Sequence, residues 1–230
     1  MSATPSPKHG AATAHIADLL REAIIRGEFA PGARIRQEQV AELTGASRAP
    51  VREALRMLAA EGLVDLVANS GARVSSLSLT ECEEIYRVRE RLEPLLLGMS
   101  ARGLADADLD RLDGLALEMT RTSDAEEFLA LDRAFHLGTY AGADTVVLTD
   151  LVTRLWNRTQ SYRRVYTALM DERARHVVHD EHRLIVAAIR DGDLDSAETL
   201  LAGHIRRTRR QLAGHPEVFA DAATTTRNIA

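Results

Sequence analysis

Three arginines recur at every fourth residue in one short segment, at Arg48, Arg52 and Arg56. Side chains four residues apart project from the same face of an α-helix, so this spacing predicts a basic stripe. Guanidinium groups on such a stripe can clamp phosphates or donate two hydrogen bonds to the O6 and N7 atoms of guanine. The alternative interpretation is a solvated helix face without a ligand.

A second set of residues has the types that bind metal ions. Asp132 and His136 are four residues apart, and His182 and His204 follow on later segments, each within an apolar helical pattern. All four are expected to point into the interior of a helix bundle, where facing helices assemble metal sites. One carboxylate and three imidazoles suit a divalent transition metal, zinc first, with nickel, manganese and iron as alternatives.

Two other interpretations of this second set stay open. Each histidine taken alone is more often a hydrogen-bonded core residue than a ligand. His176 and His179 are neighbouring competitors, and we favour His182 because it lies nearer the centre of its apolar stripe.

The arginine stripe belongs to the third of three predicted short helices. These helices are expected over residues 15–26, 37–44 and 48–61, with Ser47 as the N-cap of the third. An extended piece over 33–36 precedes the second helix, and strands over 63–67 and 72–75 flank a turn at 69–71. Three helices followed by a hairpin predict a winged helix-turn-helix, whose third helix enters the major groove while the tip of the wing reaches the adjacent backbone.

The rest of the chain predicts helices only. Their expected ranges are 80–102, 106–121, 124–141, 144–168, 171–191 and 193–213, which together make an all-α bundle. Capping boxes are expected at Thr80 with Glu83 and at Ser123 with Glu126. The predicted fold is therefore mainly α, with a DNA-binding domain over 12–77, an all-helical domain over 80–214, and disorder over 1–11 and 220–230.

Composition narrows the class of protein. Hydrophobic residues make up 45% and charged residues 27%, and no apolar run reaches the roughly 18 residues of a membrane span. The polar first twelve residues lack the apolar core of a signal peptide, and the single cysteine, Cys82, fits a reducing compartment, so we expect a cytoplasmic protein without a membrane partner. Because the net charge is −5, any binding of DNA must come from a local basic face.

The segment SRAPVREAL, with EGLV after it, resembles the DNA-binding domain of the GntR family of bacterial regulators. The resemblance implies that Arg48, Arg52 and the wing glycine, Gly71, contact the operator. It also implies phosphate contacts near Ser47 and Ala49, although Ala49 lacks the hydroxyl of the threonine that is frequent there. The full set expected at DNA is Arg34, Ser47, Arg48, Ala49, Arg52, Arg56, Gly71 and Arg73.

Later segments resemble the FCD ligand-binding domain of the FadR-like branch of that family. They are EEIYRVRERLEPL, LDRAFHLGTYAGA and DEHRLIVAAIRDGDLDSAETLLAGHI. In metal-binding members an Asp-x-x-x-His pair precedes two later histidines, which implies Asp132, His136, His182 and His204 as ligands. The resemblance also implies that Arg89 meets an acidic effector, although a surface ion pair with Glu93 is an equal alternative. Asn157 and Arg158 are expected to line the same cavity, with Trp156 there or in the core.

The sequence therefore predicts a ligand-responsive, non-enzymatic regulator of transcription. We expect a homodimer that binds an inverted-repeat operator and represses a catabolic or transport operon until a small organic acid binds at the metal site. The alternatives are a metal-dependent enzyme, a pure metal sensor, and a bundle in which the metal is only structural.

Overall fold

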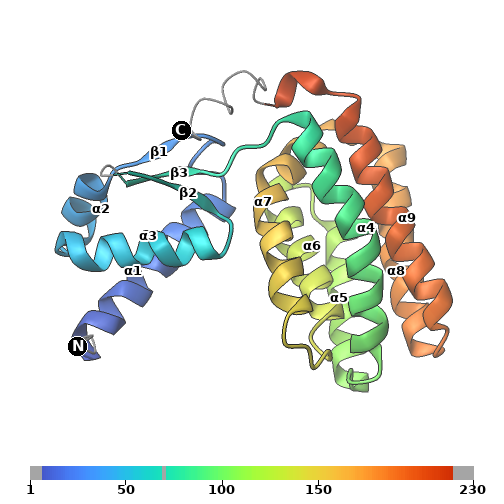
Figure 1. Ribbon diagram of the computed structural model, residues 1–230. Coiled ribbons are helices and arrows are strands. Elements are labelled where there is room, and N and C mark those ends of the chain that lie inside the picture. Colours follow the sequence, from blue (N-terminus) through green and yellow to red (C-terminus); the bar gives the residue numbers. More distant parts are fainter. Residues whose placement is uncertain (1–6, 69–70, 220–230) are drawn as a thin grey trace. The chain divides into compact units, whose positions relative to one another are not determined.

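The computed structural model describes residues 7–68 and 71–219, and their contacts divide the chain into two compact units. The first comprises Met1–Leu77 with Trp156–Ser161, and the second Ser78–Leu155 with Tyr162–Ala230. Figure 1 colours the part of the first unit before Ser78 from blue to teal, and the later part of the chain from green to red. The predicted turn residues 69–70 and the segment 220–230 lie outside the described residues.

The first unit contains the expected three helices and a small sheet. The helices are α1 (Pro7–Ile25), α2 (Gln37–Thr44) and α3 (Arg48–Ala60), and the strands are β1 (Arg34–Ile35), β2 (Val64–Val67) and β3 (Gly71–Val74). The sheet is antiparallel with the order β1-β3-β2. Because α1 begins at Pro7, residues 7–11, which we expected to be disordered, are helical.

The core of the first unit follows the apolar stripes of α1 and α3. Ile16, Leu20 and Ile24 on α1 are buried, as are Val51 and Leu55 on α3. An ion pair from Arg21 on α1 to Glu61, the residue that ends α3, has both oxygens of the carboxylate 2.7 Å from guanidinium nitrogens. This packing leaves the opposite side of α3 free for a ligand.

Two glycines fix the backbone around α3. Gly45 ends α2 with a φ of 65°, a left-handed conformation that permits the tight turn into α3. Gly71 begins β3 with a φ of 119°, and a Cβ atom there would lie 2.2 Å from the carbonyl oxygen of Ile35. Only glycine therefore allows β1 and β3 to approach as they do.

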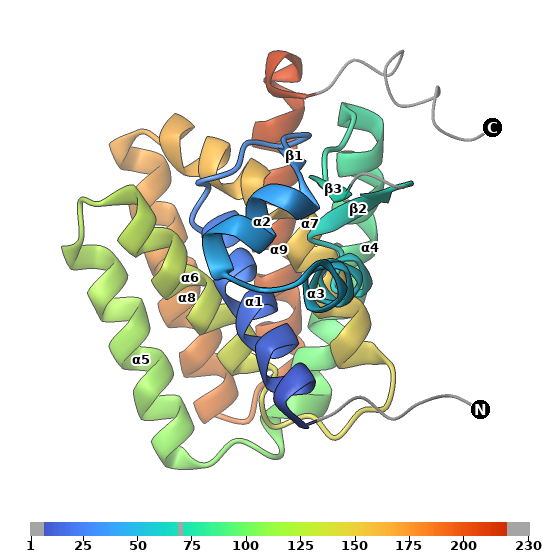
Figure 2. The same ribbon diagram turned by 90° about the vertical axis from the view of Figure 1, so that its left-hand side faces the viewer.

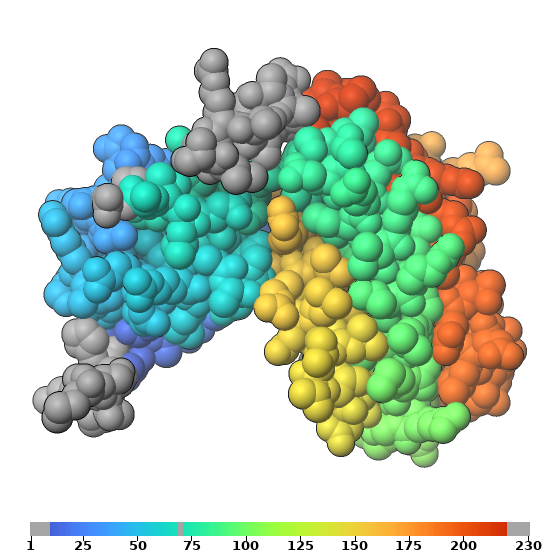
Figure 3. Space-filling model, viewed as in Figure 1, coloured from blue at the N-terminus to red at the C-terminus, as the bar shows by residue number. Residues whose placement is uncertain are grey.

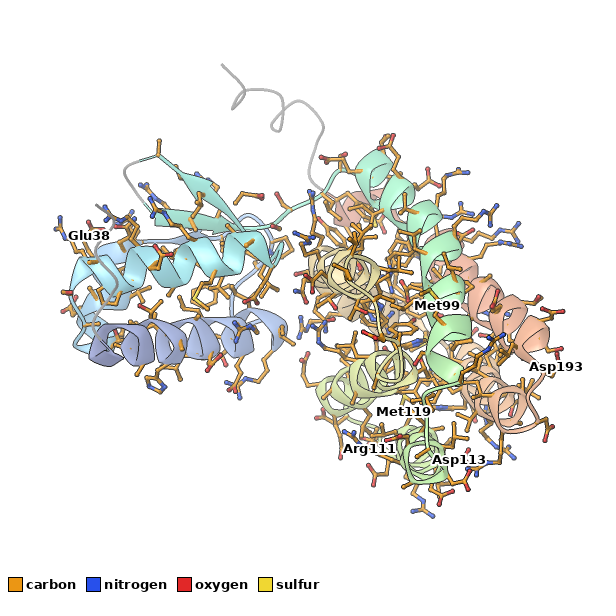
Figure 4. All side chains as sticks on the ribbon, turned by 60° about the horizontal axis from the view of Figure 1, so that its bottom comes forward. Glu38, Met99, Arg111, Asp113, Met119 and Asp193 are labelled. Atoms are coloured by element: carbon orange, nitrogen blue, oxygen red, sulfur yellow. The ribbon has the colours of Figure 1, made fainter. Side chains whose placement is uncertain are left out.

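The second unit is all-helical, as predicted. It contains α4 (Leu79–Ala101), α5 (Asp106–Arg121), α6 (Ala125–Thr139), α8 (Glu172–Arg190), α9 (Leu194–Ala213), a short 3-10 turn, η1 (Pro216–Val218), and both ends of α7 (Leu148–Leu169), whose middle, Trp156–Ser161, groups with the first unit. Helix α9 packs against α4 and α8, and α5 packs against α6 and α8. Arg190 on α8 joins α5 by ion pairs to Asp110 and Asp113, and Asp113 is labelled on the outside of α5 in Figure 4.

The capping residues of two helices differ from the sequence-based prediction. The capping box of α4 is formed by Ser78 and Glu81, two residues earlier than expected, with Glu81 N 3.3 Å from Ser78 Oγ. The N-cap of α6 is Asp124, whose side chain accepts a hydrogen bond from Glu127 N, so the box at Ser123 was also wrong. In both places another short polar residue competes for the same amide groups. No helix among the described residues is both long and apolar enough to cross a membrane.

Candidate DNA interface and candidate metal centre

Helix α3 buries one face and exposes the arginines on the other. Pro50, Val51, Ala54, Leu55 and Leu58 are buried against the first unit's core. Arg48, Arg52 and Arg56, called here the arginine face, are exposed, and so are Ser47 and Ala49 at the start of the helix. Figure 2 views α3 nearly along its axis, and Figure 3 shows its atoms in cyan on the surface of the first unit.

A hollow of about 640 Å³ lies along the arginine face. Its lining includes all three arginines, Ala49 and Gln37, and the wing residues Leu66, Val67 and Gly71. The wing and α3 therefore border one concave surface, which suits a rod-like polyanion.

The arginines are only loosely held by acidic neighbours. Arg48 pairs over 3.7 Å with Glu38, which lies in the first turn of α2 and is labelled in Figure 4, and both side chains are mostly exposed. Arg56 pairs with Glu53 at 3.2 Å on the same helix. Arg52 makes no ion pair among the described residues. Exposed pairs contribute little free energy, so a phosphate can replace these partners at small cost.

Two more arginines face each other on the sheet. Arg34 on β1 is directly opposite Arg73 on β3, and both are exposed. Arg73 also donates a hydrogen bond to the carbonyl oxygen of Gly32 at 3.0 Å. Like charges directly opposite destabilise a sheet, and Asp65 on β2, directly opposite Arg73 on its other side, offsets part of this repulsion. The DNA-contact role that the sequence predicts for both residues stays a prediction.

The four expected metal ligands meet inside the second unit. Asp132 and His136 lie on α6, His182 on α8 and His204 on α9; all are buried, and their ligand atoms lie within 4.8 Å of one another. These four residues are called here the ligand cluster. Oδ1 of Asp132 is 3.6 Å from Nε2 of His136 and of His182, and the two Nε2 atoms are 3.3 Å apart.

These separations fit a shared metal ion. Two donor atoms about 2.1 Å from one ion in a tetrahedral arrangement lie about 3.4 Å apart. The donor set and its spacing thus fit a divalent transition metal.

Burial favours neutral imidazole, which is the form that binds metal ions. Removal from water, with the nearby His204 and Arg89, holds the pKa of His136 well below its ordinary value. Burial, followed by the charges of His204 and His136, likewise holds the pKa of His182 well below its ordinary value. Both rings are therefore neutral at pH 7, as a ligand must be.

Two charged residues contact the ligand cluster from outside, and sequence reasoning missed both. The guanidinium of Arg163, buried on α7, contacts Oδ2 of Asp132. The carboxylate of Glu181 on α8 lies 3.0 Å from Nδ1 of His204. Arg163 lies three residues after the buried Gln160 and four before the buried Thr167, so extending the buried stripe of α7 could have identified it.

Arg89 is buried instead of forming the surface ion pair that the sequence also allowed. Its guanidinium contacts Glu93, as the spacing predicted, but both side chains are almost completely excluded from water. Glu93 also accepts a hydrogen bond of 2.6 Å from the hydroxyl of Tyr140. Arg89 lies 4.8 Å from the ring centre of Tyr86, whose buried hydroxyl has no hydrogen-bond partner among the described residues.

The second buried arginine belongs to the same region. Burial lowers the pKa of Arg163 to about 10, with Tyr86 and Arg89 among the neighbours that influence it. The region around the ligand cluster therefore holds two buried guanidinium groups, from α4 and from α7.

The remaining expected effector residues lie on α7. Trp156 is fully buried, Asn157 is buried and Arg158 is half-buried. All three fall in the segment Trp156–Ser161, which groups with the first unit. A role for Asn157 and Arg158 beside Arg89 stays a prediction.

Comparisons with known proteins agree with this architecture. The model of the bacterial regulatory proteins of the gntR family matches residues 12–74, and the FCD domain model matches residues 84–207. The chain belongs to the GntR family. It pairs the family's helix-turn-helix domain with an FCD domain, so the winged domain and the bundle predicted from the sequence are confirmed.

Individual GntR relatives are regulators of transcription. An HTH-type transcriptional regulator in an unstable DNA locus of Streptomyces ambofaciens is 33% identical, over 91% of this chain and 92% of the relative. The HTH-type transcriptional repressor GlaR of Escherichia coli is 31% identical, over 81% of this chain and 89% of the relative. The solved structure of E. coli McbR/YncC shares the fold, with a TM-score of 0.77 at 23% identity over 88% of this chain and 97% of that one. Both families and these relatives are regulators and not enzymes.

Proposed function

We propose that this GntR regulator is a homodimeric repressor, released from operator DNA by a small organic acid that binds beside a metal ion in the FCD domain. The observation that carries the proposal is the convergence of the four-residue ligand cluster, buried and within 4.8 Å, with the buried Arg163 in contact with it. The exposed arginine face supplies the DNA-binding surface. A bacterial repressor of this kind works in the cytoplasm, where the chromosome lies.

The arginine face supports a role in the major groove. In a helix-turn-helix the N-terminal end of the recognition helix approaches the base edges, and here that end carries Arg48 and Arg52. The exposed Arg34 on β1 and Arg73 on β3 would add phosphate contacts beside the recognition helix. Two copies related by a two-fold axis would present two such surfaces to an inverted repeat.

Asp132, His136, His182 and His204 would hold the metal, zinc first. When bound, the ion would supply a Lewis-acidic position for an oxygen of the effector. The chain's own contribution is to exclude water, to keep two of the imidazoles neutral and to fix the ligand atoms before the ion arrives.

The charge of this region supports an acid as the effector. The buried charged side chains that face it are Arg89 and Arg163 against Glu93 and Asp132, and the nearly buried Glu181 adds one more negative charge, so they sum to −1. A divalent ion adds two positive charges in a place where water cannot solvate them. A carboxylate ligand would neutralise the remaining positive charge, whereas a pure metal sensor would leave it uncompensated.

One titration tests the proposal. Fluorescence anisotropy with DNA from the gene's own upstream region would be measured with the metal-free protein, with zinc, and with zinc plus a panel of small carboxylic acids. We expect operator binding with zinc and its loss with one acid of the panel. If zinc alone controls binding and no acid changes it, the pure metal sensor is the correct function. If neither zinc nor any acid changes binding, the ion is at most structural.

A further inference from the structure

The ligand His204 has a charged partner on its outer side. Glu181, on α8, precedes the ligand His182 by one residue, and its carboxylate turns toward α9. Oε2 of Glu181 lies 3.0 Å from Nδ1 of His204, and the Glu181 side chain is only 12% exposed. One helix thus supplies a ligand of its own and a contact to a ligand on the neighbouring helix.

This contact decides which nitrogen of His204 faces the cluster. An imidazole that donates its Nδ1 proton to a carboxylate keeps a lone pair on Nε2. A carboxylate in this position also makes the ligating nitrogen more basic, which strengthens its bond to a metal ion. His182 has no such partner, because its Nδ1 atom lacks a hydrogen bond among the described residues.

Glu181 is itself held in place from α9. Nε of Arg207 lies 3.2 Å from Oε1 of Glu181, and Nη2 of Arg207 contacts the same oxygen. One oxygen of the carboxylate therefore faces His204 and the other faces Arg207. Such a bridged carboxylate cannot rotate away from the imidazole without losing two charged contacts.

We infer that Glu181 is the positioning residue of the metal centre, fixing the tautomer and the direction of His204, with Arg207 as its anchor. The inference rests on the proposed metal site. The competing interpretation is an ion pair that only joins α8 to α9. That interpretation predicts an effect on the stability of the bundle and none on the bond between His204 and a metal ion.

The test is metal affinity, measured by competition with a chromophoric chelator on the full chain, together with the visible absorption of the cobalt-substituted protein. Loss of an outer carboxylate of this kind weakens metal binding by about 10–100-fold. We expect Glu181→Gln to weaken zinc and cobalt binding within that range and to shift the cobalt absorption bands. The matched control is Glu90→Gln, because Glu90 is a similarly buried carboxylate, paired with Arg209 at 2.6 Å, that no recorded contact joins to the cluster.

The outcomes separate this inference from the proposed function. Wild-type affinity and an unchanged cobalt spectrum in Glu181→Gln, with metal lost in His204→Ala, would overturn the positioning role and leave the metal site intact. No zinc or cobalt binding by the wild-type chain would instead overturn the metal site. If circular dichroism shows that Glu181→Gln does not fold, Arg207→Gln replaces it in the test. We expect Arg207→Gln to weaken zinc binding severalfold. Zinc binding with wild-type affinity in that variant would overturn the inference.

Discussion

At the scale of single residues, the same side-chain type has opposite roles in the two units. Arg52 is exposed and makes no ion pair among the described residues, whereas Arg89 and Arg163 are buried against carboxylates. An exposed guanidinium is available to a polyanion, and a buried one is committed to a nearby charge. Exposure and partners therefore separate Arg52, a proposed DNA contact, from Arg89 and Arg163, which lie in the proposed effector region.

Arg52→Ala tests the exposed role. If Arg52 binds a base edge, its loss should weaken operator binding by about 1–3 kcal/mol and relax the preference at one base pair. Anisotropy titrations on the operator and on single-base variants measure both effects. The control is Arg26→Ala, which removes an exposed arginine paired with Glu22 and Glu28 at the end of α1. Equal effects of the two substitutions would remove Arg52 from the interface.

The buried histidines predict how stability depends on pH. His136 and His182 have folded-state pKa values held well below the ordinary value by burial, so the unfolded chain binds more protons as the pH falls. Stability is therefore fully present above about pH 6.5 and is lost below it. For two such groups the metal-free protein should lose roughly 2–3 kcal/mol between pH 7.5 and pH 5.5.

Urea unfolding of the metal-free chain at the two pH values measures this loss. His176→Gln is the control, because His176 is exposed on α8 and its replacement should leave the pH dependence unchanged. A free energy of unfolding that stays constant down to pH 5.5 would contradict the burial of neutral imidazoles.

At the scale of elements, the wing depends on one glycine. A Cβ at Gly71 would overlap the carbonyl oxygen of Ile35, and its φ of 119° is strained for any other residue. Gly71→Ala should therefore loosen the pairing of β1 with β3 by about 1–3 kcal/mol or more and weaken DNA binding. Hydrogen exchange of the β3 amides measures the loosening.

Gly45→Ala is the matched control for the wing. Gly45 also has a positive φ, at 65°, but nothing lies within 4 Å of an added Cβ. Its replacement by alanine should lower the free energy of unfolding by only about 1 kcal/mol, the cost of a left-handed backbone conformation in alanine. Hydrogen exchange of the β3 amides should stay near the wild-type level. Equal exchange in the two variants would show that the close approach to Ile35 does not hold the wing.

Periodicity predicted the elements well because the amphipathic stripes are long. Leu109, Leu112 and Ala116 repeat along α5, which runs over the predicted range, residues 106–121. The expected capping residues of α4 and α6 were wrong because Ser78 and Asp124 compete with neighbouring polar residues for the same amide groups. The four ligands could be found from their places on apolar stripes. Glu181 could not, because its partner, His204, is on another helix and only the packing of α8 against α9 brings them together.

At the scale of the whole molecule, the proposed DNA-binding and ligand-binding sites lie in different units. The arginine face belongs to the first unit and the ligand cluster to the second. A ligand can change DNA binding only if it has different affinities for the DNA-binding and released states. The proposed effector must therefore bind these two states unequally, and the reciprocal effect of DNA on effector affinity must have the same size.

Metal should stabilise the unit that binds it. At a free concentration one hundred times the Kd, zinc contributes about 2.7 kcal/mol, which raises the melting temperature by roughly 5–10 °C. Calorimetry of the chain with and without zinc measures the shift, and His204→Ala should abolish it while keeping the helical circular dichroism. A full zinc-dependent shift in His204→Ala would show that His204 is not a ligand.

A chain of net charge −5 can bind duplex DNA only through a local basic face, which here is the arginine face. The most direct test is the affinity of the purified protein for its own upstream DNA, measured as a function of salt concentration. Each phosphate contact contributes a slope of about −0.9 to the plot of log K against log salt. We predict a steeply negative slope that becomes shallower when Arg48, Arg52 and Arg56 are replaced by alanine. No measurable binding at low salt, or a slope that these three substitutions leave unchanged, would contradict the account.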